Sequence, residues 1–172
     1  MGQNSAESQE NQMDHFEIEA TETETSKKIG YIIEISGSGA KALCGVEILR
    51  EMSNMDNDDT EFSPGQIGTI LKIKVSKGFL YVTVSDVKAQ QSADGKIKNA
   101  VMDLDFLGHG IRAPYTQSGM IFDRGVTDFP IPGQPIYPVS LRDVEGIFGD
   151  NDSNHFHLGR VYPQHLTPAS IN

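Results

Sequence analysis

Residues 66–84 read QIGTILKIKVSKGFLYVTV and carry the strongest structural pattern in the chain. In the first half of this stretch, apolar residues share one face of a period-two strand: Ile67, Leu71, Ile73 and Val75. The connection Ser76-Lys77-Gly78 separates it from a second half that is dense in aromatic and β-branched residues. Two such runs joined by a short connection that ends in glycine predict a β-hairpin.

Further strands are predicted on both sides of this hairpin. Upstream, residues 30–36 (GYIIEIS) and the alternating apolar residues of 42–48 suit two strands. Downstream, residues 102–106 alternate between apolar residues and the aspartates Asp103 and Asp105, which predicts a strand with one solvent-facing side. Shorter strands are predicted at 120–122, 134–138 and 156–162.

Only one helix is predicted, after Ser140. The sequence S-L-R-D places Asp143 at the third helical position, where it forms a capping box with Ser140. The following apolar residues share one helical face: Leu141, Val144, Ile147 and Phe148. Many short strands with a single helix near the C-terminus predict an all-β fold, a small closed β-barrel of about six strands. A β-sandwich is the second architecture that fits.

The first 28 residues differ in composition from the rest of the chain. They contain seven acidic and two basic residues, half of the net charge of −10, and few large apolar side chains. Such a segment cannot bury enough apolar surface to offset its ordering entropy. We therefore predict a disordered acidic tail over 1–28 and one barrel domain over 29–172, which suits a chain of 172 residues. The acidic residues 51–61 are predicted to form a surface loop.

The overall composition excludes several classes of protein. A net charge of −10 should repel a phosphate backbone, which argues against a free-standing nucleic-acid clamp. The single cysteine, Cys44, excludes an internal disulfide and a cysteine-based zinc framework, and we place it in the core. No apolar run approaches the about 20 residues that span a bilayer, and the N-terminus has no signal-peptide core. The sequence indicates a soluble, cytoplasmic protein without a membrane partner.

Three short patterns match ligand-binding motifs only in part. Residues 37–42 (GSGAKA) match the G-x-G-x-x-A of dinucleotide-binding folds, but no βαβ pattern follows, so we interpret them as a hairpin turn. Residues 150–154 and 56–61 resemble the start of calcium-binding loops yet lack the glycine and the final glutamate, which indicates solvated loops. The sequence contains no nucleophile elbow. We predict no catalytic, cofactor-binding or metal-binding residues.

A metal- or ligand-binding barrel enzyme is one alternative. His155 and His157 would share one face of a strand, as would Asp103 and Asp105, and imidazole and carboxylate groups are common metal ligands. This function requires the four side chains to converge in one pocket. We favour the simpler interpretation that both pairs lie on the solvent side of their strands.

The C-terminal third carries the most specific pattern of the chain. Its blocks are, in order, 122–130 (FDRGVTDFP), 132–139 (PGQPIYPV), 143–149 (DVEGIFG), 157–163 (HLGRVYP) and 168–171 (PASI). In order and spacing, these blocks resemble the N-terminal barrel of HerA-type ATPases, hexameric DNA translocases of bacteria and archaea. Residues 29–33 (IGYII) and 65–73 (GQIGTILKI) are also similar to barrel strands of that family. The resemblance extends over 29–172.

The resemblance implies a barrel that serves assembly and performs no catalysis itself. In that family the barrel precedes an ATPase domain, which uses ATP and Mg, so we expect such a domain to follow residue 172 in a longer parent chain. Six barrels packed around an axis would hold the motor domains in a ring that acts on DNA. The opposite rim would dock a nuclease or another effector protein, as in repair or antiviral defence. We expect the isolated barrel to be a monomer or a weak oligomer.

Exposed apolar residues on the rim would mark the docking surface. The candidates are Phe79 and Tyr81 in the central hairpin and Ile147 and Phe148 on the helix, although a core position would explain all four as well. Phe79 and Tyr81 would also be the stacking platform of an OB-like nucleic-acid-binding module, a further alternative. The charge of the chain argues against that alternative.

Overall fold

The computed structural model describes residues 27–53, 64–116 and 119–148, together with the backbone of two further strands. These two strands, β8 (Phe156–Arg160) and β9 (Pro168–Ile171), pair with each other in antiparallel orientation. The predicted acidic tail lies outside the described residues except for Lys27 and Lys28. Residues 54–61 of the predicted acidic loop also lie outside them.

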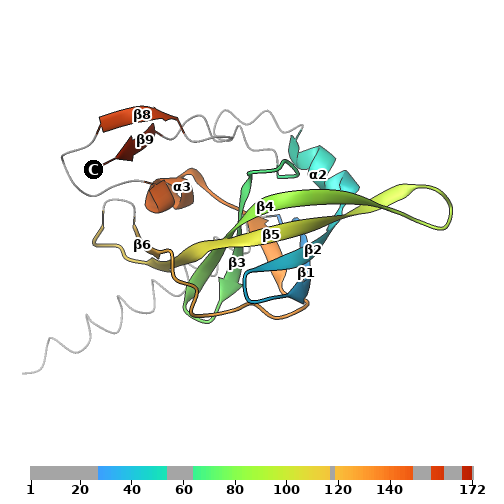
Figure 1. Cartoon of the computed structure of the whole chain (residues 1–172), viewed down its shortest axis with the longest axis horizontal. Coiled ribbons are helices and arrows are strands. Elements are labelled where there is room, and N and C mark those ends of the chain that lie inside the picture. Colours follow the sequence, from blue (N-terminus) through green and yellow to red (C-terminus); the bar gives the residue numbers. More distant parts are fainter. Residues whose placement is uncertain (1–26, 54–63, 117–118, 149–155, 161–167, 172) are drawn as a thin grey trace, which may run out of the picture.

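Six antiparallel strands form a closed barrel (Figure 1). The barrel strands are β1 (Gly30–Ile35), β2 (Gly39–Gly45), β3 (Ile70–Val75), β4 (Gly78–Gln91), β5 (Ile97–Arg112) and β7 (Pro135–Pro138). They follow the order β2-β1-β7-β3-β4-β5, and pairing of β2 with β5 closes the ring. The predicted barrel is confirmed, and the sandwich alternative is wrong.

The central hairpin forms where the sequence predicts it. Strands β3 and β4 pair from Ile70↔Thr83 to Val75↔Gly78, and Gly78 adopts the left-handed φ of 109° that a tight connection requires. Strands β4 and β5 are longer than predicted, because they continue as a twisted ribbon to a turn at residues 92–95 (Figure 1). The polar residues of this ribbon do not end the strands, since each strand still pairs with the other.

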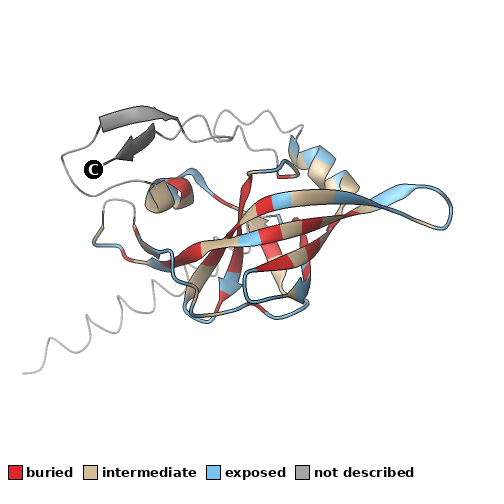
Figure 2. Ribbon diagram, in the orientation of Figure 1, coloured by how far each residue is buried: buried red, intermediate tan, exposed pale blue. Residues whose placement is uncertain are grey.

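The inner core fills the barrel, and its members alternate along strands β2 to β5. Figure 2 shows the buried residues on the barrel strands. The members of the inner core are Ile29, Ile32, Ala40, Ala42, Cys44, Leu71, Ile73, Val75, Leu80, Val82, Val84, Met102, Leu104 and Ile136. The prediction that Cys44 lies in the core is confirmed, since the residue is 1% exposed.

A second apolar cluster lies on the outer face of β3 and β4, where it is covered by β6 (Met120–Asp123) and α3 (Leu141–Phe148). Its buried members are Ile70, Tyr81, Met120, Val139 and Val144. Glycine makes the close approach possible, because a Cβ on Gly110 would lie 2.6 Å from the Tyr81 ring and 2.5 Å from the Met120 sulfur. This part of the barrel wall is therefore buried on both sides.

Two helices occur in the described part of the chain, one more than predicted. Strand β2 ends at Gly45, and the predicted continuation to residue 48 is wrong, because α2 (Val46–Ser53) begins there. The helix turns Leu49 and Met52 onto the inner core, so tertiary packing outweighs the β-branched residues in its first turn. Each helix has eight residues, well short of the about 20 that an apolar helix needs to span a bilayer.

Candidate functional site

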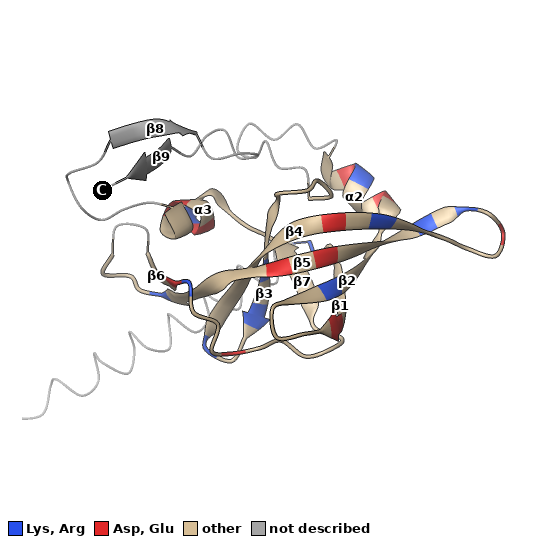
Figure 3. Cartoon of the chain, in the orientation of Figure 1, with Lys and Arg blue, Asp and Glu red and all other residues tan. Residues whose placement is uncertain are grey.

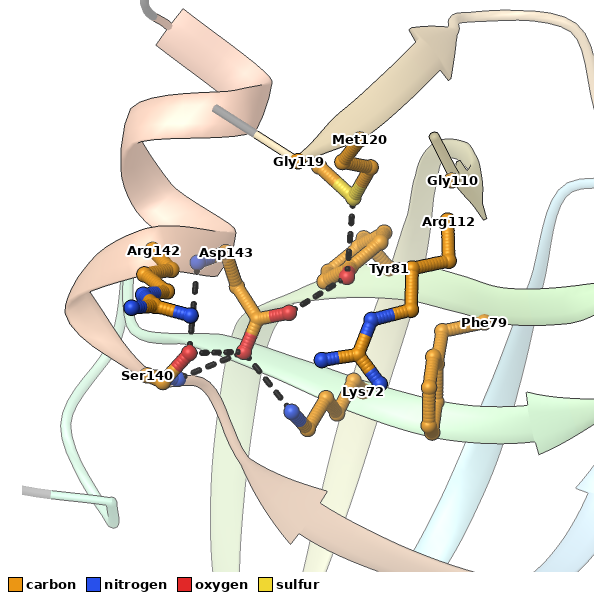
Figure 4. A pocket seen from close by; sticks show the side chains of 10 residues that line it. All are labelled: Lys72, Phe79, Tyr81, Gly110, Arg112, Gly119, Met120, Ser140, Arg142 and Asp143. Atoms are coloured by element: carbon orange, nitrogen blue, oxygen red, sulfur yellow. Dashed lines mark hydrogen bonds and ion pairs between the residues drawn. The ribbon is translucent and has the colours of Figure 1, made fainter. Parts of the chain in front are cut away.

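A buried ion pair joins α3 to the outside of the barrel wall. Lys72 Nζ on β3 lies 2.7 Å from Asp143 Oδ2 in the first turn of α3, and the two side chains are only 10% and 12% exposed. The hydroxyl of Tyr81 on β4 donates a hydrogen bond to Asp143 Oδ1 at 2.6 Å (Figure 4). These three side chains, the clip triad, connect a helix to two neighbouring strands.

The same carboxylate also caps the helix. The backbone N–H and the hydroxyl of Ser140 donate to Asp143 Oδ2 at 2.6 and 2.7 Å, and the N–H of Asp143 donates to Ser140 Oγ at 3.3 Å. The capping box predicted from the sequence is thereby confirmed. Asp143 thus combines the end of a helix with a cross-link to the barrel.

Two opposing effects set the pKa of Asp143. Burial by itself raises it, but the Lys72 ammonium and the hydrogen bonds from Lys72, Tyr81 and Ser140 outweigh burial. The net pKa lies below the ordinary value of an aspartate. A carboxylate with this pKa is a weak general base, so the arrangement suits a structural role better than proton transfer.

A pocket of about 90 Å³ opens beside the clip triad (Figure 4). The charged residues among its described lining are Lys72, Arg112, Arg142 and Asp143. Phe79 forms part of the wall, and Lys72 Nζ lies 5.0 Å from the centre of its ring, a cation–π distance. Within the described part of the chain, the pocket therefore brings charged side chains together with an aromatic ring.

The four residues predicted as docking candidates lie in or against the second apolar cluster, on the outer face of β3 and β4. Tyr81 is 1% exposed, so it does not offer a docking or stacking surface. Phe79, Ile147 and Phe148 are partly buried and pack against that cluster. Their role in binding a partner stays a prediction.

Other apolar side chains are exposed at the barrel end away from α3. The segment 124–134 crosses this end between β6 and β7 (Figure 1). One hydrogen bond joins it to β1, where the N–H of Gly133 donates to the Ile32 carbonyl at 2.7 Å. Another joins it to the β3–β4 turn, where the N–H of Ser76 donates to the carboxylate of Asp128 at 3.1 Å. On and beside the segment lie Phe129, Ile131 and Ile33, which are 46%, 65% and 46% exposed. We call these three residues the rim patch.

The structure describes only the two aspartates of the alternative metal site, and both lie on β5. Asp103 lies on the outer wall and pairs with Lys88, which also contacts Asp86, within the charges that alternate along β4 and β5 (Figure 3). Asp105 is exposed. The side chains of His155 and His157 lie outside the described residues. Among the residues described, no three His, Cys, Asp or Glu side chains are grouped so that they could hold a metal.

Of the three short motifs that resemble ligand-binding sequences, the structure describes residues 37–42. Residues 37–42 form the β1–β2 turn and the start of β2, with Ser36 Oγ accepting from Gly39 N–H at 3.1 Å, so the hairpin interpretation is confirmed. Both calcium-like loops, 150–154 and 56–61, lie outside the described residues. Burial raises the pKa of the Cys44 thiol to about 12, which keeps it protonated and unreactive.

Sequence reasoning missed the partners of Asp143. The one signal in the sequence is Lys72, a cation in the middle of an apolar strand. Arg112 and Arg142 gave no signal, because they meet at the pocket only through the fold. No protein-family model and no curated protein sequence matches this chain.

Proposed function

We propose that this chain is a non-catalytic assembly and docking barrel of a HerA-like, ATP-driven DNA translocase. The observation that carries the proposal is the closed six-strand antiparallel barrel. The motif-bearing segment 122–148 forms the end of β6, the connection 124–134, β7 and α3, in that order. This is the architecture that the sequence resemblance implies.

Barrel closure determines how such a domain can associate. In a closed barrel the strands have no free edges, so neighbouring copies meet through side chains on the outer wall. Packing six barrels around one axis would bury that wall and hold the attached motors in a ring. In this proposal ATP, Mg and DNA are bound by the motor of the full translocase, and the barrel contributes protein contacts alone.

The rim patch is the surface that we assign to the effector. Phe129, Ile131 and Ile33 are large exposed apolar side chains on and beside the segment 124–134. Exposed apolar groups gathered at one end favour protein binding, because burying them releases about 25 cal/mol for each Å² removed from water. The hydrogen bonds to β1 and the β3–β4 turn hold the segment in place before a partner arrives.

The docking role is tested with the protein purified from its own cells through an affinity tag. The expected result is co-purification of a nuclease or another effector activity with the wild-type protein, and its loss from an Ile131→Glu variant. The matched control is Ile97→Glu, which places the same charge on another exposed isoleucine, in the β4–β5 ribbon. Equal activity in both variants, or no effector activity with wild type, would contradict the proposal.

A further inference from the structure

Two lysines lie beside the segment that carries the rim patch. Gln134 joins Ile131 to the end of β3: its side-chain oxygen accepts from the Ile131 N–H at 2.8 Å, and its amide nitrogen donates to the Lys74 carbonyl at 3.3 Å. Lys77 lies in the β3–β4 turn, which is hydrogen-bonded to the segment 124–134. Figure 3 shows basic residues at the end of β3 and in the turn after it. Apolar and basic side chains therefore meet at this place on the barrel.

Both lysines are available to an anionic partner. They are exposed, and within the described part of the chain neither is paired with a carboxylate. The carboxylates beside the patch are already engaged. Asp128 accepts hydrogen bonds from the N–H and the hydroxyl of Ser76, and Glu34, next to Ile33, is paired with Lys41 at 2.8 Å. A carboxylate brought by a partner would thus find a cation to pair with.

We infer that the rim patch, together with Lys74 and Lys77, binds an acidic peptide segment that also carries large apolar side chains. The apolar groups of the segment would cover the rim patch, and its carboxylates would pair with the two lysines. Such complementarity selects the partner and speeds its association. The inference rests on the proposed function and deepens it, because it states the chemistry of the effector segment that docks here.

A peptide fits this surface better than a bilayer or a nucleic acid does. Clusters that bind anionic lipids carry about 4–8 basic residues, more than the two lysines supply. A nucleic acid presents a continuous line of phosphates, which a chain of net charge −10 repels. A short peptide needs to contact only the rim patch and its two lysines.

The test measures the binding of fluorescein-labelled synthetic peptides to the purified full chain by fluorescence anisotropy. The probe has the sequence Ser-Glu-Phe-Glu-Ile-Glu-Phe-Glu-Ser, and its matched control has glutamine in place of every glutamate. We expect saturable binding of the glutamate peptide and about fivefold weaker binding of the glutamine peptide, the value of two exposed ion pairs. The difference between the peptides should shrink in about 0.5 M sodium chloride.

Variants of the chain locate the binding. Lys74→Gln combined with Lys77→Gln should weaken the glutamate peptide about fivefold and leave the glutamine peptide unchanged. Ile131→Glu should abolish the binding of both peptides, because it places a charge in the apolar patch. The matched control combines Lys96→Gln with Lys98→Gln, which removes two exposed lysines near the tip of the β4–β5 ribbon and should change nothing.

Several results would overturn the inference. They are equal binding of the two peptides, and a Lys74→Gln, Lys77→Gln variant that binds the glutamate peptide as tightly as wild type does. Phosphatidylserine-containing vesicles that bind more tightly than the peptide, and that the same variants release, would assign the surface to a membrane instead. If an effector co-purifies but the peptides do not bind, this inference fails and the proposed function stands. Peptide binding without a co-purifying effector supports the inference and contradicts the proposed function.

Discussion

The clip triad makes a strong prediction for the substitution Asp143→Asn. The asparagine keeps the shape of the side chain but leaves Lys72, which is 10% exposed, without its carboxylate. Removing one partner of a buried ion pair costs about 3–5 kcal/mol. The asparagine can still accept from Ser140, and Lys72 keeps its contact with the Phe79 ring, so we expect the lower end, about 3 kcal/mol. The melting temperature should then fall by about 6–12 °C.

Urea unfolding followed by circular dichroism measures this loss, which is convenient because the chain has no tryptophan. In a double-mutant cycle with Lys72→Met, the two changes together should cost less than the sum of the single changes by at least about 1 kcal/mol. The matched control is Asp86→Asn, which removes the exposed 2.6 Å pair with Lys88 and should leave the unfolding midpoint unchanged. A loss for Asp143→Asn no greater than that of the control, or zero coupling with Lys72, would refute the reasoning.

The pH dependence of stability follows from the same carboxylate. The pKa of Asp143 is lower in the folded chain than its ordinary value, so its stabilising contribution is fully present above about pH 4. It is lost as the pH falls through the lower folded pKa. We predict a constant difference in unfolding free energy between wild type and Asp143→Asn from pH 5 to 7, and a shrinking difference below pH 4. A difference that grows on acidification would contradict this sign.

Three other predictions concern single sites. His109→Leu should leave the free energy of unfolding unchanged or raise it by about 1 kcal/mol in thermal melts. The reason is that Nε2 of this 6% exposed histidine has no hydrogen-bond partner within the described structure. A marked loss of stability would contradict this prediction. Gly110→Ala should cost about 1–3 kcal/mol, because the added Cβ collides with an aromatic ring and a methionine sulfur, whereas Gly37→Ala meets no atom within 4 Å and serves as the neutral control. The Cys44 thiol, with its pKa raised to about 12, should react with a disulfide reagent only at the rate of unfolding; fast reaction in native buffer would show that it is not buried.

The features that sequence reasoning predicted correctly are local ones. The hairpin at 66–84 follows from alternation and a glycine at the turn, and the capping box follows from Ser140 and Asp143 being three residues apart. Helix α2 and the full length of β4 and β5 could not be predicted in this way. They depend on packing against the inner core and on pairing between distant segments, which local preferences do not reveal.

The site shows the same division between local and distant contacts. Asp143 could be assigned as a cap, but its hydrogen-bond partners Lys72 and Tyr81 lie 71 and 62 residues away in the sequence. The period-two pattern of 67–75 leaves Lys72 on the face opposite the apolar residues, but it cannot tell that α3 covers this face and buries the lysine. Tyr81, predicted as a docking candidate or a core residue, is a core residue for the same reason.

The proposal that this barrel belongs to a ring is tested by the native mass of the protein taken from its own cells. We predict a particle that contains six copies and hydrolyses ATP. A monomer that lacks both ATPase activity and associated subunits would contradict it.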